Sequence, residues 1–328
     1  MVLVGRGARA PLKLRASGLL DSTTYMRGYF LLLVGGCAIA CGGQPAPTKS
    51  AHDAGTGKAE VEVPRTVVTP TRASDIPELL KEAEALAAAQ RWKEAAAAYD
   101  RIYALDPEGP TGDEAVWGAA VNHDKARNFE PALARFELYA QREPDSQRGL
   151  QSLVVASRLL VFLGRYAPAG TYAERALKHL DSFGNLDRIA VLSARALALV
   201  DRGEDREASY FIEKARDVIE THQLDAPGQV PLDVAQLYYA LGESRRVKAE
   251  RILFQPLPPN FGAVLEERCQ LLLDAQGASS DSMRAYDPHW SAMAGFRTAE
   301  LYQRLHQDLL AVQPPASADP ERKRQLFE

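Results

Sequence analysis

The chain has 328 residues, of which 46% are hydrophobic and 25% are charged, values typical of a globular protein with one or two domains. Aromatic residues make up only 8%, alanine is abundant and β-branched runs are scarce, so we expect an all-α protein. The formal net charge is −4, although residues 1–41 carry five basic residues and one acidic residue. The remainder is therefore acidic, which argues against nucleic-acid binding because that function needs a basic surface.

The N-terminal segment has the layout of an export signal. Met26 and Arg27 precede an apolar run over 29–40, which is shorter than the roughly 20 residues that a membrane-spanning helix needs. The small residues "AIA" precede Cys41, and "VGG" precedes Cys37. This pattern resembles the signal of bacterial lipoproteins, in which small residues precede a cysteine that is acylated and becomes the first residue. The resemblance predicts lipidation at Cys41, with Cys37 as the alternative.

Other interpretations of the two cysteines lead to different proteins. A metal or redox pair is disfavoured because the spacing differs from the usual two-residue gap and no partner ligands lie nearby. A cleaved secretory signal without lipid would give a soluble periplasmic protein. Neither cysteine is followed by aspartate, the residue associated with inner-membrane retention in the lipoprotein family. We therefore expect a periplasm-facing anchor in the outer membrane. Met26 is also an alternative start, because residues 1–25 have no clear role in a signal.

Residues 42–74 are rich in Gly, Pro, Ser and Thr, and show no periodicity. Such a segment cannot bury enough apolar area to offset its ordering entropy, so we expect a disordered tether. From Asp75 onward, apolar residues recur at helical spacing after a capping pair and a proline in the first turn.

Four later segments repeat one pattern, beginning with "RWKEAAAAYDRIYALDP" and "NFEPALARFELYAQREP". Their anchor alanines are spaced by 37, 37 and 39 residues, and each is followed four residues later by a second packing residue. The anchors and their partners are Ala95 with Tyr99, Ala132 with Phe136, Ala169 with Ala173, and Ala208 with Ile212. The pattern resembles the tetratricopeptide repeat, a unit of two helices that stacks into a right-handed solenoid. The alanine would let the second helix press against the first, and its partner would fill the space between them.

The resemblance divides the chain into several parts. We expect four repeats over 75–222, degenerate helical repeats over 223–312 and a C-terminal tail over 313–328. Gly164 and Gly203 would sit at the turns inside two repeats, and Gly242 at the turn of a fifth. Helical periodicity continues over 260–286 and 288–311.

The tail itself begins a new helix. Asp319 is suited to cap a helix that starts at Pro320, yet only nine residues remain, so we expect a chain cut short of its natural end. A natural short tail is the alternative.

The sequence offers little for catalysis. Its six histidines are scattered, and the zincin and nucleophile-elbow motifs are missing. Cys269 lies in an apolar helical pattern and is expected to be a buried core thiol. We therefore expect no enzyme, no metal site and no cofactor.

The repeat family binds partners in a groove lined by the first helices of successive units. Carried over to this chain, the groove-facing positions are Trp117, Val121, Lys125, Val154, Arg158, Val161 and Phe162. Isolated cations at Lys125 and Arg158 in an acidic body would favour an acidic or carboxyl-terminated partner segment. The alternative is that Trp117 and Phe162 belong to the core between repeats.

These resemblances imply a non-enzymatic, membrane-anchored scaffold for protein–protein interactions in the bacterial cell envelope. The partners would be other envelope proteins, held in the groove, and the bilayer, held through the acyl anchor. Lipoproteins of this repeat type serve in outer-membrane assembly, secretion and surface motility, and the C-terminal pattern is similar to periplasmic proteins of gliding-motility complexes. An accessory subunit that positions a cell-wall enzyme is the alternative, and an enzyme in its own right ranks third.

Overall fold

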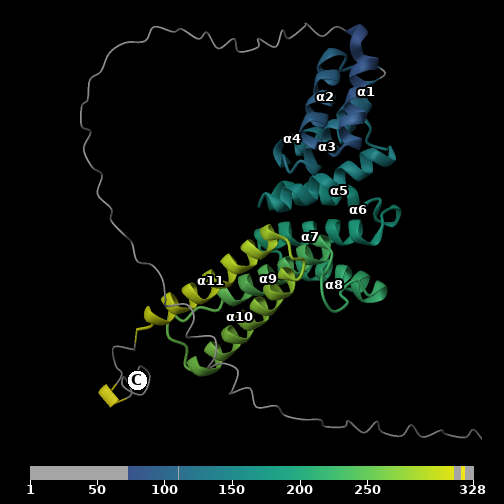
Figure 1. Cartoon of the computed structure of the whole chain (residues 1–328). Coiled ribbons are helices and arrows are strands. Elements are labelled where there is room, and N and C mark those ends of the chain that lie inside the picture. The colour runs from purple at the N-terminus through teal and green to yellow at the C-terminus, as the bar shows by residue number, and fades with distance from the viewer. Residues whose placement is uncertain (1–72, 110, 314–318, 322–328) are drawn as a thin grey trace, which may run out of the picture. The chain divides into compact units, whose positions relative to one another are not determined.

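The computed structural model describes residues 73–109, 111–313 and 319–321. Within these ranges the regular elements are all helices, which confirms the expected all-α class (Figure 1). The α-helices are α1 (Ile76–Ala88), α2 (Trp92–Leu105), α3 (Gly112–Lys125), α4 (Phe129–Arg142), α5 (Gln147–Phe162), α6 (Tyr166–Leu177), α7 (Asn185–Arg202), α8 (Asp205–His222), α9 (Leu232–Glu250), α10 (Phe261–Met283) and α11 (Pro288–Leu310), with 3-10 turns at Ala73–Asp75 and Leu180–Ser182. The predicted signal, with Cys37 and Cys41, and nearly all of the predicted linker lie outside the described residues. Of the predicted C-terminal helix only the start is described, where the Asp319 carboxylate accepts the Glu321 N–H at 3.1 Å.

Helices α1 to α8 form four consecutive pairs, and each helix packs against the next in chain order (Figure 1). The anchor residues explain this packing. Ala95, Ala132, Ala169 and Ala208 are all 0% exposed, so no side chain larger than a methyl group separates the helices at these points. Their partners four residues later are buried as well, and they fill the space one turn away on the same helix face.

The turns inside the four pairs share one backbone conformation. Gly164 and Gly203 have φ values of +71° and +79°, as expected for glycines five residues before an anchor. Gln90 and Arg127 occupy the same place in the first two pairs, and both have φ of +59°. The first two units therefore adopt the left-handed turn without the residue that best suits it.

The pattern changes after the fourth pair. Gly242 lies in the interior of α9, so the predicted fifth turn at this position is wrong. A Cβ atom at Gly242 would lie 3.3 Å from the Ala275 carbonyl oxygen of α10. The glycine therefore serves a close approach of two long helices, a role that local pattern cannot distinguish from a turn. Helices α10 and α11 match the segments whose periodicity predicted them.

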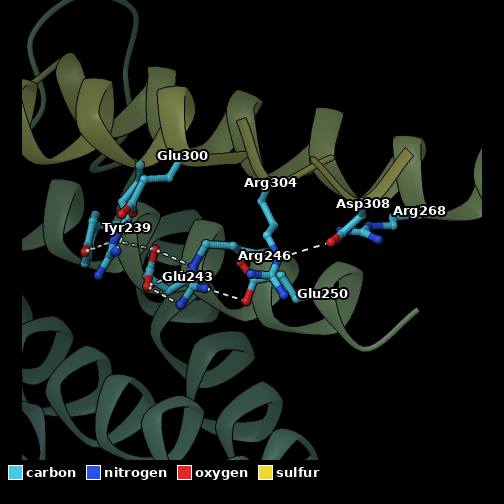
Figure 2. A network of polar contacts seen from close by, with 9 residues as sticks. Tyr239, Glu243, Arg246, Glu250, Arg268, Glu300, Arg304 and Asp308 are labelled. Carbon is cyan, nitrogen blue, oxygen red and sulfur yellow. Dashed lines mark hydrogen bonds and ion pairs between the residues drawn. The ribbon is translucent and has the colours of Figure 1, made fainter. Parts of the chain in front are cut away.

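A network of charged groups joins α11 to α9 and α10 (Figure 2). Glu243 of α9 is only 5% exposed and pairs with Arg246 at 2.9 Å and with Arg297 of α11 at 3.3 Å. Farther along, Asp308 of α11 pairs with Arg268 of α10, whose side chain is 1% exposed. Apolar contact is limited here to a small cluster that includes Leu301. The first turn of α11 differs, because Trp290 belongs to the main core, which extends from α3 to α9.

Candidate partner-binding site

A cavity of about 370 Å³ opens where the C-terminal ends of α3 and α5 meet the N-terminal ends of α4, α9 and α11. All five helices and the turns before α4 and α11 contribute to its walls. The lining includes both apolar and charged side chains. The apolar lining consists of Phe129, Leu159, Phe162, Leu232 and Trp290. The polar lining consists of Asp124, Lys125, Arg127, Arg158, Asp233, Gln236 and Asp287.

Arg158 links the start of α9 to α5 through an ion pair. Its Nε donates to the Asp233 carboxylate at 2.7 Å, and its Nη2 donates to the Asp187 carboxylate of α7 at 3.0 Å. The Arg158 side chain is 30% exposed, so both pairs are partly shielded from water. Burial raises the pKa of Asp233 despite the neighbouring Arg158, because desolvation disfavours the carboxylate.

The start of α11 closes the other side of the cavity. Asp287 caps this helix by accepting the backbone N–H groups of His289 and Trp290 at 2.9 and 3.2 Å. Its second oxygen lies 3.7 Å from Arg127 in the turn between α3 and α4. The His289 ring stacks on Phe162 with centroids 3.5 Å apart. Burial lowers the pKa of His289, which favours a neutral ring on this aromatic face.

Asp124 is the remaining acid of the cavity wall. Within the described part of the chain its carboxylate makes neither a hydrogen bond nor an ion pair. Burial raises the pKa of Asp124, an effect larger than the lowering by Arg158, Arg127 and Lys125. The nearby Lys125 ammonium instead lies over the Trp92 ring, 4.5 Å from its centroid.

The cavity gathers three of the seven residues predicted to line a groove, namely Lys125, Arg158 and Phe162. Trp117 lies elsewhere, edge-on to Phe136 and Tyr139 of α4 with centroids 5.9 and 5.4 Å apart. Trp117 therefore packs mainly inside the second helix pair, and the next pair reaches it through Arg148 of α5, which lies over its ring at 5.3 Å from the centroid.

The other predicted positions on these helices also pack inward. Val121 is partly buried against the main core, and Val154 and Val161 are 0% and 3% exposed within it. The two α5 valines are therefore corrected from groove to core. Helix α5 packs against α4, α6 and α7 at once, which leaves it only a narrow accessible stripe.

The expectation of an isolated cation at Arg158 is also corrected, because two carboxylates already pair with it. The residues that sequence reasoning missed come from α9 and α11, which lie far along the chain from α5. Leu232 and Asp233 carry no groove signature. The Asp-Pro pair at 287–288 did signal a helix start, but a local signal does not show which distant helix that start will contact.

Among the described residues, the other histidine and cysteine side chains lie outside the cavity lining. His123 contacts the Asp100 carboxylate at 2.8 Å, and Arg135 donates to the same group at 2.8 Å. Cys269 is a free thiol and is half-buried rather than fully buried as expected. Among the described residues, no cluster of three His, Cys, Asp or Glu side chains is placed to hold a metal ion. No helix in that part of the chain combines the length and apolar character needed to cross a bilayer.

Comparisons with known proteins place few constraints on this chain. No family model matches the sequence, and no curated protein matches it. Among solved structures, the human IFIT1 dimer with m7Gppp-AAAA is similar at a TM-score of 0.36 and 18% sequence identity. The similarity covers 76% of this chain and 53% of that one, so this chain spans about half the length of the structure it matches.

Proposed function

We propose that this chain is a non-enzymatic scaffold that binds a segment of another protein in the cavity between α3, α5, α9 and α11. The observation that carries the proposal is the cavity itself, whose walls come from several helix pairs and combine aromatic faces with charged groups. Ligand sites in proteins have this character, with a mainly apolar lining and a few convergent polar groups. Helical-repeat proteins build such surfaces from successive units.

We further propose that the scaffold is anchored through Cys41, or through Cys37, to the periplasm-facing side of the outer membrane. Support comes from the sequence, where a basic start, a short apolar run and small residues precede the cysteines. Its partners would be other proteins of the cell envelope, in an assembly, secretion or motility complex.

Site-specific crosslinking tests the binding surface. A photo-reactive amino acid at Leu232, which lines the cavity and is 51% exposed, should crosslink a partner in intact cells. The same amino acid at Tyr210 of α8, which is 54% exposed, is the matched control. Equal crosslinking of one partner from both positions, or none from Leu232, would argue against this cavity as the binding site.

Labelling of cells with a clickable fatty acid tests the anchor. We expect full label in the parent chain and loss of label when serine replaces both Cys37 and Cys41. Full label in the double variant would refute the lipid anchor, while leaving the binding surface untouched.

A further inference from the structure

The cations of the cavity are not isolated, contrary to the prediction from the sequence for Lys125 and Arg158. Arg158 is the most enclosed cation, and Asp233 and Asp187 both pair with it at 3.0 Å or less. Two carboxylates on one guanidinium leave this group with a net negative charge. An incoming carboxylate at Arg158 would therefore meet two acids that already hold the guanidinium.

The cations at the edge of the cavity are also engaged. Arg127 lies 3.7 Å from Asp287 and over the Phe129 ring. Lys125 lies over the Trp92 ring. Arg127 therefore already has a carboxylate partner, and the Lys125 ammonium lies against an aromatic ring outside the cavity lining.

Asp124 is the acid that lacks a partner. Asp124 lines the cavity, and its carboxylate makes no hydrogen bond or ion pair within the described residues. A partly buried carboxylate without a hydrogen-bond donor loses part of its favourable hydration free energy. A cationic ligand would replace the lost water contacts with an ion pair. The apolar side chains of Leu159 and Phe162 line the same cavity and match the methylene stem of a long cationic side chain.

We propose that the cavity binds a lysine or arginine side chain of a partner segment, with its charged head on Asp124 and its stem along Leu159 and Phe162. This inference rests on the proposed scaffold function and specifies the chemistry of the segment bound. It reverses the expectation of an acidic or carboxyl-terminated partner. The cavity lining holds three acids, Asp124, Asp233 and Asp287, against three cations. Asp233 and Asp287 already have ion-pair partners, so the unpaired carboxylate of Asp124 selects the sign of the ligand.

Three matched peptides test the proposal by isothermal titration against the full-length chain. They are acetyl-Leu-Lys-Leu-amide, the same peptide with norleucine, which keeps the stem without the charge, and the same peptide with glutamate. We expect the lysine peptide to bind about tenfold more tightly than the norleucine peptide, and the glutamate peptide to bind most weakly. Equal binding of the three, tighter binding of the glutamate peptide, or no binding of any at millimolar concentration would overturn the proposal.

Two variants locate the interaction. Asp124→Asn should abolish the preference for lysine over norleucine, whereas Asp217→Asn on the exposed side of α8 should leave it intact. A lysine preference that persists in Asp124→Asn would refute the role of this carboxylate. The preference of the parent chain among the three peptides decides the sign of the ligand even if a variant fails to fold. Crosslinking at Leu232 without any lysine preference would refute this inference alone and leave the scaffold function standing.

Discussion

Gln90 and Arg127 hold a backbone conformation that suits glycine, as their counterparts Gly164 and Gly203 show. We expect Gln90→Gly to raise the free energy of unfolding by about 0.5–1 kcal/mol, because it relieves left-handed strain at an exposed turn. The converse change, Gly164→Ala, should lower the free energy of unfolding by about 1 kcal/mol. The added Cβ atom would meet no atom within 4 Å, so the cost comes from backbone strain alone. Urea denaturation measures both. Unchanged midpoints in the two variants would mean that this turn conformation carries no strain.

The partly buried carboxyl group of Asp124 should make the stability of the folded chain depend on pH. Burial raises its pKa in the folded chain, so the folded state holds this proton more tightly than the unfolded state does. The resulting destabilisation is absent below the ordinary pKa of aspartate, near 4, and complete above the raised pKa of the folded state. We expect Asp124→Asn to raise the melting temperature by about 2–4 °C at pH 7 and to give no gain at low pH.

Parallel thermal melts of parent and variant across this pH range measure the difference. The charged groups that face Asp124 are Arg158, Arg127 and Lys125, and all three lower its pKa by less than burial raises it. A variant less stable than the parent at pH 7 would show that Asp124 is satisfied in the folded state, contrary to the geometry.

Ala132 tests the packing at one helix crossing. Leucine at this fully buried position adds three carbons between helices already in contact, so we expect Ala132→Leu to cost about 1–3 kcal/mol. Ala134→Leu is the matched control, because Ala134 is exposed on the same helix. Thermal melting compares the two, and equal stability would place Ala132 outside a packed crossing.

Ion pairs join α11 to α9 and α10 (Figure 2). Asp308→Asn removes the carboxylate from Arg268, which is 1% exposed. Among the described residues, Arg268 then keeps the Ile252 carbonyl oxygen and the Phe254 ring as partners. Loss of one partner from a buried pair costs about 3–5 kcal/mol, and we expect about 3 because Asp308 itself is 29% exposed.

Asp281→Asn at the end of α10 is the control for this prediction. Its pair with Arg284 spans 3.6 Å, and the Asp281 side chain is 49% exposed, so less than about 1 kcal/mol should be lost. Chemical denaturation gives both values. A cost for Asp308→Asn no larger than that of the control would mean that the buried pair does not hold α11.

The elements differ in how far the sequence could predict them. Anchor alanines and turn glycines are local signals, and the structure places Ala95 and Gly164 as those signals predicted. Gly242 shows the limit, because a glycine in a turn and a glycine at a helix crossing look alike in one sequence. Val154 shows another limit, since the exposed stripe of a helix depends on how many neighbours cover it.

The candidate site was only partly predictable for a related reason. Lys125, Arg158 and Phe162 lie on the helices that the repeat pattern assigned to the groove. The remaining walls come from α9 and α11, and their approach depends on how successive helix pairs rotate against one another. That rotation is a sum of small packing angles, so no single residue reveals it.

Contacts between distant helices set this chain apart from a repeat array with neighbour contacts alone. Arg158 of α5 pairs with Asp233 of α9, and the Tyr166 and Tyr239 hydroxyls of α6 and α9 lie 3.1 Å apart. Phe162 then stacks on His289 of α11. In an ideal solenoid each repeat contacts only its neighbours, and stability propagates from one to the next. Here the start of α11 is coupled directly to the end of α5.

This coupling predicts how a disturbance in α11 spreads. Trp290 is 4% exposed in the main core that includes α5, whereas Leu301 of the same helix packs only in the cluster of α9, α10 and α11. We expect Trp290→Leu to speed amide hydrogen exchange in α5 as well as in α9, with α1 and α2 unchanged. Leu301→Ala should affect α9 to α11 and leave α5 at the parent rate, although it removes a comparable volume of buried side chain. Exchange followed by mass spectrometry resolves these segments. If Trp290→Leu changes only α9 to α11, the long-range contacts do not stabilise the cavity, and its walls open independently of one another.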